Sequence, residues 1–263
     1  MKPRASFPVR LESAVGTAGR TSPVGLAVSG SSTAPVSMAA RGSDHTHGLD
    51  SSAVRMNMVH KLAGQGITDR MVLSALGAIE RHRFIDSALI NQAYEDTSLP
   101  IGLGQTISKP GVVSRMIELL RNGAPGKLGR VLEIGTGCGY QAALLSLVAT
   151  EVYSIERLRG LHDKARENLR HLRLANLHLL FGDGMVGYAK GAPYAGIIAA
   201  AGGEAVPQAW VDQLAVGGRL VAPVVSGGKR NQQTLLVLDK TPHGVEQTVL
   251  EAVHFVPLKS GIA

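Results

Sequence analysis

The sequence predicts an α/β fold with a mostly parallel central sheet, antiparallel strands near the C-terminus and additional helices near the N-terminus. Three observations support this. From residue 130 onwards short apolar segments alternate with helical patterns, as in βαβ units. A glycine-rich turn follows the first of these segments. The last three strand patterns follow one another with no helix between them.

The first part of the chain predicts helices and one long loop. An apolar spacing of four residues that begins at Val54 indicates the first helix. Thr68 or Asp69 is expected to cap the second. Residues 94–111, rich in Gly, Pro, Ser and Thr, predict a loop without regular structure, and long ordered loops are usually functional. The predicted helices are residues 52–64, 68–83 and 112–120.

The second part predicts the sheet. Apolar segments bounded by turns indicate four strands that alternate with helices, and the three segments that follow are expected to pair antiparallel. The predicted strands are residues 130–135, 151–156, 177–183, 195–201, 218–225, 233–240 and 246–258, and the predicted helices are residues 139–149, 158–173 and 207–214.

Composition limits the class of protein. Of the 263 residues 44% are hydrophobic and 4% aromatic, so the core is expected to be large and aliphatic. No apolar run reaches the ~18 residues that a membrane span requires, and no membrane partner is expected. The single cysteine, Cys138, excludes an intramolecular disulfide and agrees with a cytoplasmic location.

The formal net charge of +7 is too dispersed to predict a nucleic-acid partner. Residues 1–50 lack any helical or strand period and are expected to be a disordered N-terminal extension. Their composition is loosely similar to that of a transit peptide, but a plain tail or an over-extended translation start is favoured. His45 and His47 lie in this segment, and no metal site is predicted.

A glycine loop predicts a nucleotide-like ligand. Gly135, Gly137 and Gly139 follow a strand that ends at Ile134 and precede a helix. Glycines there allow a sharp turn and a close approach of a ligand, and the helix start offers free N–H donors. Tyr140 stands where a dinucleotide fingerprint has a small residue, which disfavours a nicotinamide-dependent oxidoreductase.

Three acidic residues are candidate ligand contacts. Glu156 ends the next strand about twenty residues after the glycine loop, a placement that suits hydrogen bonds from ribose hydroxyls. Asp183 is expected at the same sheet edge, as an acceptor from an adenine amino group or as an Asx turn. Glu133 is a candidate neighbour of a methionine amino group or a structural charge.

Three segments carry a family resemblance, and a fourth agrees with it. "LPIGLGQTISKP" (99–110), "RVLEIGTGCGYQAALL" (130–145) and "FGDGMVGYAKGAPYAGII" (181–198) resemble the protein-L-isoaspartate O-methyltransferases, and "EAVHFVPL" (251–258) is similar to their bacterial form. The resemblance covers residues from about 54 to the end. It implies a Rossmann-like S-adenosylmethionine methyltransferase fold, with helices and a substrate loop in residues 51–122 and the core in residues 123–263 of a single domain.

The resemblance also implies an activity and its residues. The expected reaction is methylation of isoaspartyl carboxyl groups in damaged proteins by a monomeric enzyme. Ser108 would hold the substrate carboxyl, with Thr106 and Ile107 shaping the peptide groove. An ionised carboxylate is already a nucleophile at neutral pH, so no general base is required. The alternative for Ser108 is a helix N-cap before Pro110.

The sequence departs from the family pattern at several places. Cys138 replaces a common Ser, Lys109 and Gly111 flank Pro110 in an unusual combination, and Ala195 replaces a common Asp. Residues 199–207 differ as well. Two alternatives therefore stay open: methylation of RNA or a small molecule, and a non-catalytic module that binds the cofactor or a peptide.

Overall fold

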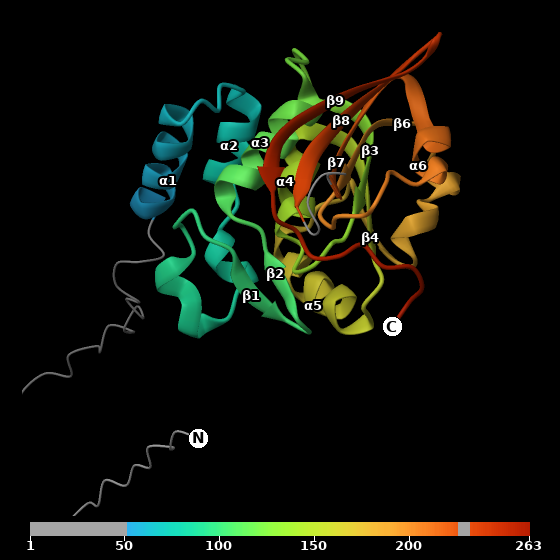
Figure 1. Cartoon of the computed structure of the whole chain (residues 1–263). Coiled ribbons are helices and arrows are strands. Elements are labelled where there is room, and N and C mark those ends of the chain that lie inside the picture. Colours follow the sequence, from blue (N-terminus) through green and yellow to red (C-terminus); the bar gives the residue numbers. More distant parts are fainter. Residues whose placement is uncertain (1–51, 226–231) are drawn as a thin grey trace, which may run out of the picture. The chain divides into compact units, whose positions relative to one another are not determined.

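The computed structural model describes residues 52–225 and 232–263, in which seven strands form one mixed sheet (Figure 1). The strand order is β5-β4-β3-β6-β7-β8-β9. The first five strands in that order are parallel, and β8 and β9 pair antiparallel, as predicted. The strands are β3 Leu128–Ile134, β4 Ala149–Glu156, β5 Leu177–Phe181, β6 Tyr194–Ala199, β7 Leu214–Val225, β8 Gln233–Thr241 and β9 Gly244–Val253.

Helices cover both faces of this sheet. On one face α3, α4 and α5 pack against the strands, and α2 lies over α4. On the other face α6 contributes the buried Trp210. The helices are α1 Ser52–Gly64, α2 Arg70–Ala78, α3 Pro110–Arg121, α4 Tyr140–Val148, α5 Arg159–Leu169 and α6 Gln208–Gln213. Short 3-10 helices are Arg81–Phe84, Ser87–Gln92, Arg170–Leu172, Gly184–Val186 and Ala189–Gly191.

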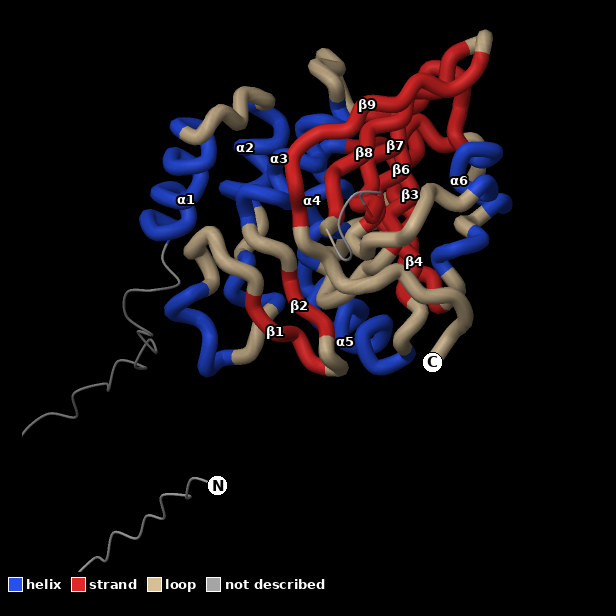
Figure 2. Tube along the Cα trace, in the orientation of Figure 1, coloured by secondary structure: helices blue, strands red, loops and turns tan. Residues whose placement is uncertain are grey.

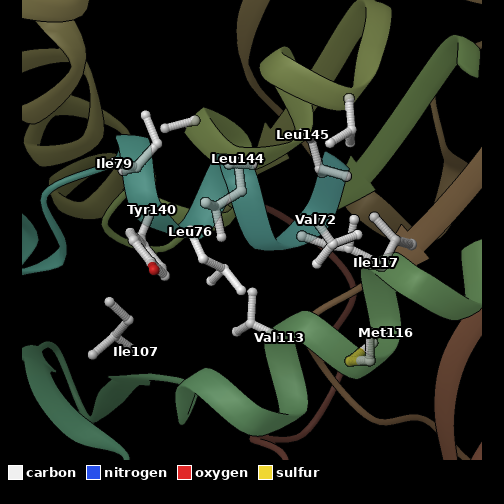
Figure 3. Packing of buried hydrophobic residues seen from close by; sticks show 14 of the residues in the cluster. Val72, Leu76, Ile79, Ile107, Val113, Met116, Ile117, Tyr140, Leu144 and Leu145 are labelled. Atoms are coloured by element: carbon white, nitrogen blue, oxygen red, sulfur yellow. The ribbon is translucent and has the colours of Figure 1, made fainter. Parts of the chain in front are cut away.

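The N-terminal helices belong to the same aliphatic core as the sheet. Val72 and Leu76 of α2 meet Ile117 of α3 and Leu144 of α4 in one cluster (Figure 3). These four side chains are at most 1% exposed. Burial of each such side chain contributes roughly 1.5–3 kcal/mol, so the N-terminal helices are held firmly against α3 and α4.

The strand order creates a crevice beside β3. From β3 the chain proceeds through β4 to β5 on one side, and it then returns to place β6 on the other side. Ligands of open α/β sheets bind at the carboxyl ends of the strands where the order reverses in this way. The loop that follows β3 is the glycine loop, which therefore lies at this crevice.

The predicted loop over residues 94–111 contains regular structure, so that prediction is wrong. Residues Leu99–Gly102 form β1 and residues Gln105–Ile107 form β2, which pair antiparallel as a hairpin (Figure 2). The side chain of Leu99 is buried opposite Ile107. The hairpin leads directly into α3 and fixes the direction in which residue 108 enters the crevice.

The second helix is shorter than predicted. Asp69 caps α2 by accepting from the backbone N–H groups of Met71 and Val72, but the helix ends at Ala78 instead of about residue 83. Arg81 then turns inward and is fully buried. Its Nε donates to the carbonyl oxygen of Ala93 at 2.8 Å. This bond requires the chain to leave the helix before Arg81.

One strand and one further helix end earlier in the structure than the sequence predicts. The strand predicted over residues 246–258 ends at Val253, and the helix predicted over residues 158–173 ends at Leu169 and continues as a 3-10 turn. The predicted N-terminal extension, residues 1–50, and the histidines at positions 45 and 47 lie outside the described residues.

Candidate active site

A cavity of about 450 Å³ lies at the carboxyl edge of the sheet. Its volume falls in the range of small-molecule and cofactor sites. Its walls come from the glycine loop, the loop after β4, the β1–β2 hairpin and the segment after β9. Segments far apart in the sequence therefore meet around one ligand-sized space.

The glycine loop adopts backbone angles that favour glycine. Gly137 and Gly139 have φ values of +57° and +94°, in the left-handed region that other residues rarely adopt. A Cβ atom on Gly139 would lie 2.8 Å from Cδ1 of Leu169 in α5. This glycine therefore serves close helix packing, and it allows α4 to start directly at the cavity.

Glu156 joins the glycine loop to the end of β4. Its Oε2 accepts the backbone N–H of Gly137 at 2.9 Å, and its Oε1 accepts that of Leu158 at 2.9 Å. Each carboxylate oxygen keeps a further lone pair. Because Glu156 lines the cavity, these lone pairs can accept hydrogen bonds from ligand hydroxyl groups, as expected for this residue from the sequence.

Two polar atoms beside the cavity lack protein partners. Among the described residues, the amide nitrogen of Gln141 and the hydroxyl of Tyr140 are buried and make no hydrogen bond, although both residues line the cavity. Burial raises the pKa of Tyr140 to about 12, so its hydroxyl stays protonated. Unpaired buried donors are costly, so the wall of the cavity contains two polar atoms that the described residues leave unsatisfied.

Glu133 lies beneath the glycine loop and does not line the cavity. Its Oε2 accepts the hydroxyl of Ser154 at 2.5 Å, and that hydroxyl lies 2.6 Å from Oγ1 of Thr136 in the loop. Burial raises the pKa of Glu133 to about 8. The carboxyl group therefore contacts the loop through Ser154 and Thr136, a connection that the sequence pattern did not predict.

Asp183 follows β5 at the same edge but does not line the cavity. Its Oδ1 accepts the backbone N–H of Met185 at 2.8 Å, which forms the Asx turn considered from the sequence. Its Oδ2 accepts the backbone N–H of Gly261 at 2.6 Å. Asp183 therefore connects the end of β5 to the last residues of the chain.

Ser108 lies where two spaces meet. It lines the main cavity together with Thr106 and Ile107, and it also lines an outer groove between α3 and the end of β9. The N-cap of α3 is Lys109, without a side-chain capping bond, so the alternative role of Ser108 as the N-cap is wrong. The Ser108 hydroxyl makes no hydrogen bond to any of the described residues and is available to a ligand.

Two glycines in the segments that depart from the family pattern, Gly111 and Gly202, lie against polar side chains. Gly111 donates its backbone N–H to Oδ1 of Asp96 at 2.6 Å, and a Cβ atom there would lie 2.9 Å from the same oxygen. A Cβ atom on Gly202 would lie 2.5 Å from Nε2 of Gln233. At both positions a polar side chain lies close to where a Cβ atom would be, so glycine leaves room for it.

The segment after β9 supplies cavity residues that were not predicted individually. Gly202 donates its N–H to the carbonyl oxygen of Val256 at 2.9 Å and accepts the N–H of Leu258 at 2.8 Å. These bonds place Val256, Pro257, Leu258 and Lys259 in the cavity wall. The only sequence signal for this wall was the family-like ending "EAVHFVPL".

Other kinds of site have no support within residues 52–225 and 232–263. In these ranges no group of three His, Cys, Asp or Glu side chains is arranged to hold a metal ion. No helix there combines the length and the apolar character that crossing a membrane requires.

Comparison with known proteins links this chain to one family. The family model described as protein-L-isoaspartate(D-aspartate) O-methyltransferase (PCMT) matches residues 53–263. A protein-L-isoaspartate O-methyltransferase of Methylibium petroleiphilum is 54% identical, covering 99% of this chain and 97% of the relative. One from Leptothrix cholodnii is 58% identical, covering 82% of this chain and 76% of the relative.

Solved structures agree with the fold. A protein-L-isoaspartate O-methyltransferase structure is 28% identical with a TM-score of 0.71, over 78% of this chain and 66% of that chain. A Plasmodium falciparum chain in complex with S-adenosyl-L-homocysteine is 24% identical with a TM-score of 0.67, over 78% of this chain and 98% of that chain. The predicted Rossmann-like methyltransferase fold is confirmed.

Proposed function

The chain belongs to the protein-L-isoaspartate(D-aspartate) O-methyltransferase family, and on this premise we propose that it methylates the free carboxyl group of L-isoaspartyl residues in damaged proteins. The methyl donor is S-adenosylmethionine, whose sulfonium supplies an electrophilic methyl group when it is bound. The methyl ester then allows the substrate backbone to form a succinimide, so the repair step itself needs no residue of the enzyme.

The strongest support for this proposal is the position of Ser108. Its hydroxyl has no partner within the described chain, and it stands between the cavity and the outer groove. A peptide in the groove brings its carboxylate to this hydroxyl, which donates a hydrogen bond to one oxygen and leaves the other oxygen free to attack. Such alignment lowers the barrier without a general base, because the carboxylate is already ionised.

The cavity residues fit the cofactor in charge and shape. Glu156 offers carboxylate lone pairs to the ribose hydroxyls, and the amide of Gln141 offers an unpaired donor to the methionine portion. We assign Gly135 and Gly137 to the backbone wall. Outside the cavity lining, Glu133 supports that wall through Ser154, and Asp183 is assigned to the adenine end through the loop after β5 that it holds.

The peptide side of the site is assigned to the hairpin. Thr106 and Ile107 line the cavity directly before Ser108, and the ring of Tyr140 points towards Ile107 (Figure 3). The side chain of Ile107 is buried on this side, and a bound peptide that covers the groove would exclude water from the carboxylate and strengthen its hydrogen bond to Ser108. Damaged proteins and peptides are thus the proposed partners, and the enzyme is proposed to act as a cytoplasmic monomer.

The test is methyl transfer from labelled S-adenosylmethionine to a matched pair of peptides, one with isoaspartate and one with normal aspartate. We expect label on the isoaspartyl peptide alone, released as methanol by mild base. Label on neither peptide, with the cofactor still bound, would contradict the proposal and favour the non-catalytic alternative. Label on RNA instead would assign the chain a different acceptor.

A further inference from the structure

The last residues of the chain lie against the loops that follow β4 and β5. We call residues 259–263 the C-terminal strap. Lys259 lines the cavity. Two residues later the backbone N–H of Gly261 donates to Asp183 at 2.6 Å, and its carbonyl oxygen accepts Nε of Arg157 at 2.8 Å. The strap therefore extends from the cavity wall to the ends of two neighbouring strands.

A pair of backbone bonds completes the attachment. Ala263 donates its N–H to the carbonyl oxygen of Arg157, and its own carbonyl oxygen accepts the N–H of Arg159, both at 2.8 Å. Figure 2 shows the segment after β9 ending beside α5. Arg157 directly follows Glu156, the proposed ribose acceptor, so the strap is attached at the adenosyl end of the cavity.

The residues to which the strap is attached are held by their own contacts, whereas the strap itself is exposed to solvent. The guanidinium of Arg159 stacks over the ring of Phe181, 3.7 Å from its centroid, which joins the start of α5 to the end of β5. All five strap residues are exposed, and Ile262 is 59% exposed. Lifting the strap therefore breaks hydrogen bonds but exposes no core.

We propose that the C-terminal strap is a releasable closure of the cofactor cavity, which must open to exchange S-adenosylhomocysteine for S-adenosylmethionine after each methyl transfer. Asp183 holds the strap in the closed position by accepting the backbone N–H of Gly261. This inference rests on the proposed function, because it requires the cofactor to occupy the cavity. Closures of this kind commonly limit product release in enzymes.

The experiment measures the dissociation rate of S-adenosylhomocysteine from the full chain and from strap variants. Gly261→Pro removes the N–H that Asp183 accepts, and proline cannot adopt the φ of +76° at this position. Deletion of residues 260–263 removes all four bonds. Each hydrogen bond contributes roughly a factor of two to ten. Gly261→Pro should therefore accelerate release at least about twofold, and the deletion about tenfold or more.

The matched control is Ile262→Ala, which shortens an exposed side chain in the same strap and keeps every backbone bond. It should release the ligand at the wild-type rate. All three variants should keep the melting temperature of the wild type, which separates a closure from a structural role. Unchanged release after deletion of residues 260–263 would overturn the proposal. Failure of the wild type to bind S-adenosylhomocysteine would instead overturn the proposed function.

A second comparison tests the role of Asp183 as the fastening residue. Asp183→Asn weakens the acceptor of the Gly261 N–H, so combining it with Gly261→Pro should accelerate release by less than the product of the two single effects. Fully multiplicative effects would show that Asp183 acts on the cofactor independently, and would remove it from the closure.

Discussion

The carboxylate of Glu156 accepts the backbone N–H of Gly137 at 2.9 Å, so the proposed ribose acceptor and the glycine loop form one hydrogen-bonded unit. Two structural elements that follow different strands are thereby held at a fixed separation. A change at Glu156 is expected to alter the ligand contact and the loop together.

Glu156→Gln should weaken cofactor binding. The neutral amide has only one acceptor oxygen, so one of the two backbone donors, on Gly137 or Leu158, loses its acceptor and the other loses its charged partner. Loss of such a bond corresponds to roughly a 10- to 100-fold increase in Kd, measured by calorimetry with S-adenosylhomocysteine. Glu151→Gln, at the other end of β4 and outside the cavity, is the control. Equal Kd values for both variants would refute the assignment.

Ser108→Ala should reduce methyl transfer without affecting the cofactor. Removing a hydrogen bond to a charged carboxylate costs about 1.5–3 kcal/mol, so kcat/KM for the isoaspartyl peptide should fall roughly 10- to 100-fold. The Kd of S-adenosylhomocysteine should stay unchanged. Ser87→Ala, at an exposed position outside both spaces, should behave as wild type. Normal kcat/KM in Ser108→Ala would rule out the proposed contact.

Glu133 should make stability depend on pH. Its pKa is about 8 in the folded chain against an ordinary value of 4.5, so the folded state holds a proton that the unfolded state has lost. The free energy of unfolding should therefore fall between about pH 5 and pH 8, by up to ~1.4 kcal/mol per pH unit. Urea unfolding of Glu133→Gln should show a flatter profile, because the amide has no proton to lose. A profile as steep as that of the wild type would contradict the assigned pKa.

Asp69→Ala should destabilise the fold strongly. Asp69 caps α2 and also pairs with Nε of Arg121 at 2.7 Å, where both side chains are largely buried. Leaving a buried charge without its partner costs about 3–5 kcal/mol. Asp86→Ala removes an exposed N-cap that forms no ion pair with any residue that the structure describes, and it should cost only ~1 kcal/mol. Similar losses for the two variants in urea unfolding would show that the pair contributes little.

The parallel sheet and its ligand edge were predictable because local patterns encode them. The C-terminal halves of β3 and β4 are largely buried, so each strand reads as a mainly apolar segment that ends at a turn. The glycines after β3 and the carboxylate at the end of β4 mark the carboxyl edge directly. Local spacing therefore sufficed to place Gly137 and Glu156 in one site.

The β1–β2 hairpin was missed because its strands have only four and three residues. Pro100 and Gly102 occupy the outward positions of β1, where a longer strand would carry polar side chains, so the alternation resembles a loop. Pairing with β2 stabilises the strand, and such pairing has no signature within so short a window.

Contacts between distant residues were beyond prediction. Asp183 and Gly261 lie 78 residues apart, and nothing in the Gly-Asp-Gly segment indicates a partner near the end of the chain. The position of Asp183 at the sheet edge was inferred correctly, since strand ends converge there. Which backbone donor reaches its carboxylate depends on the path of the whole C-terminal segment.

The central position of β3 has a consequence for biosynthesis. A nascent chain that has emerged as far as β5 already contains the glycine loop and Glu156. It still lacks β6, whose following residue Ala200 donates its N–H to the carbonyl oxygen of Ile134 at 2.8 Å. Domains generally fold as units, and the cavity wall includes residues 256–259, so the ligand pocket cannot be complete before these residues have been synthesised. A polypeptide released before β6 is synthesised would contain the glycine loop but could not form the cavity that binds the ligand.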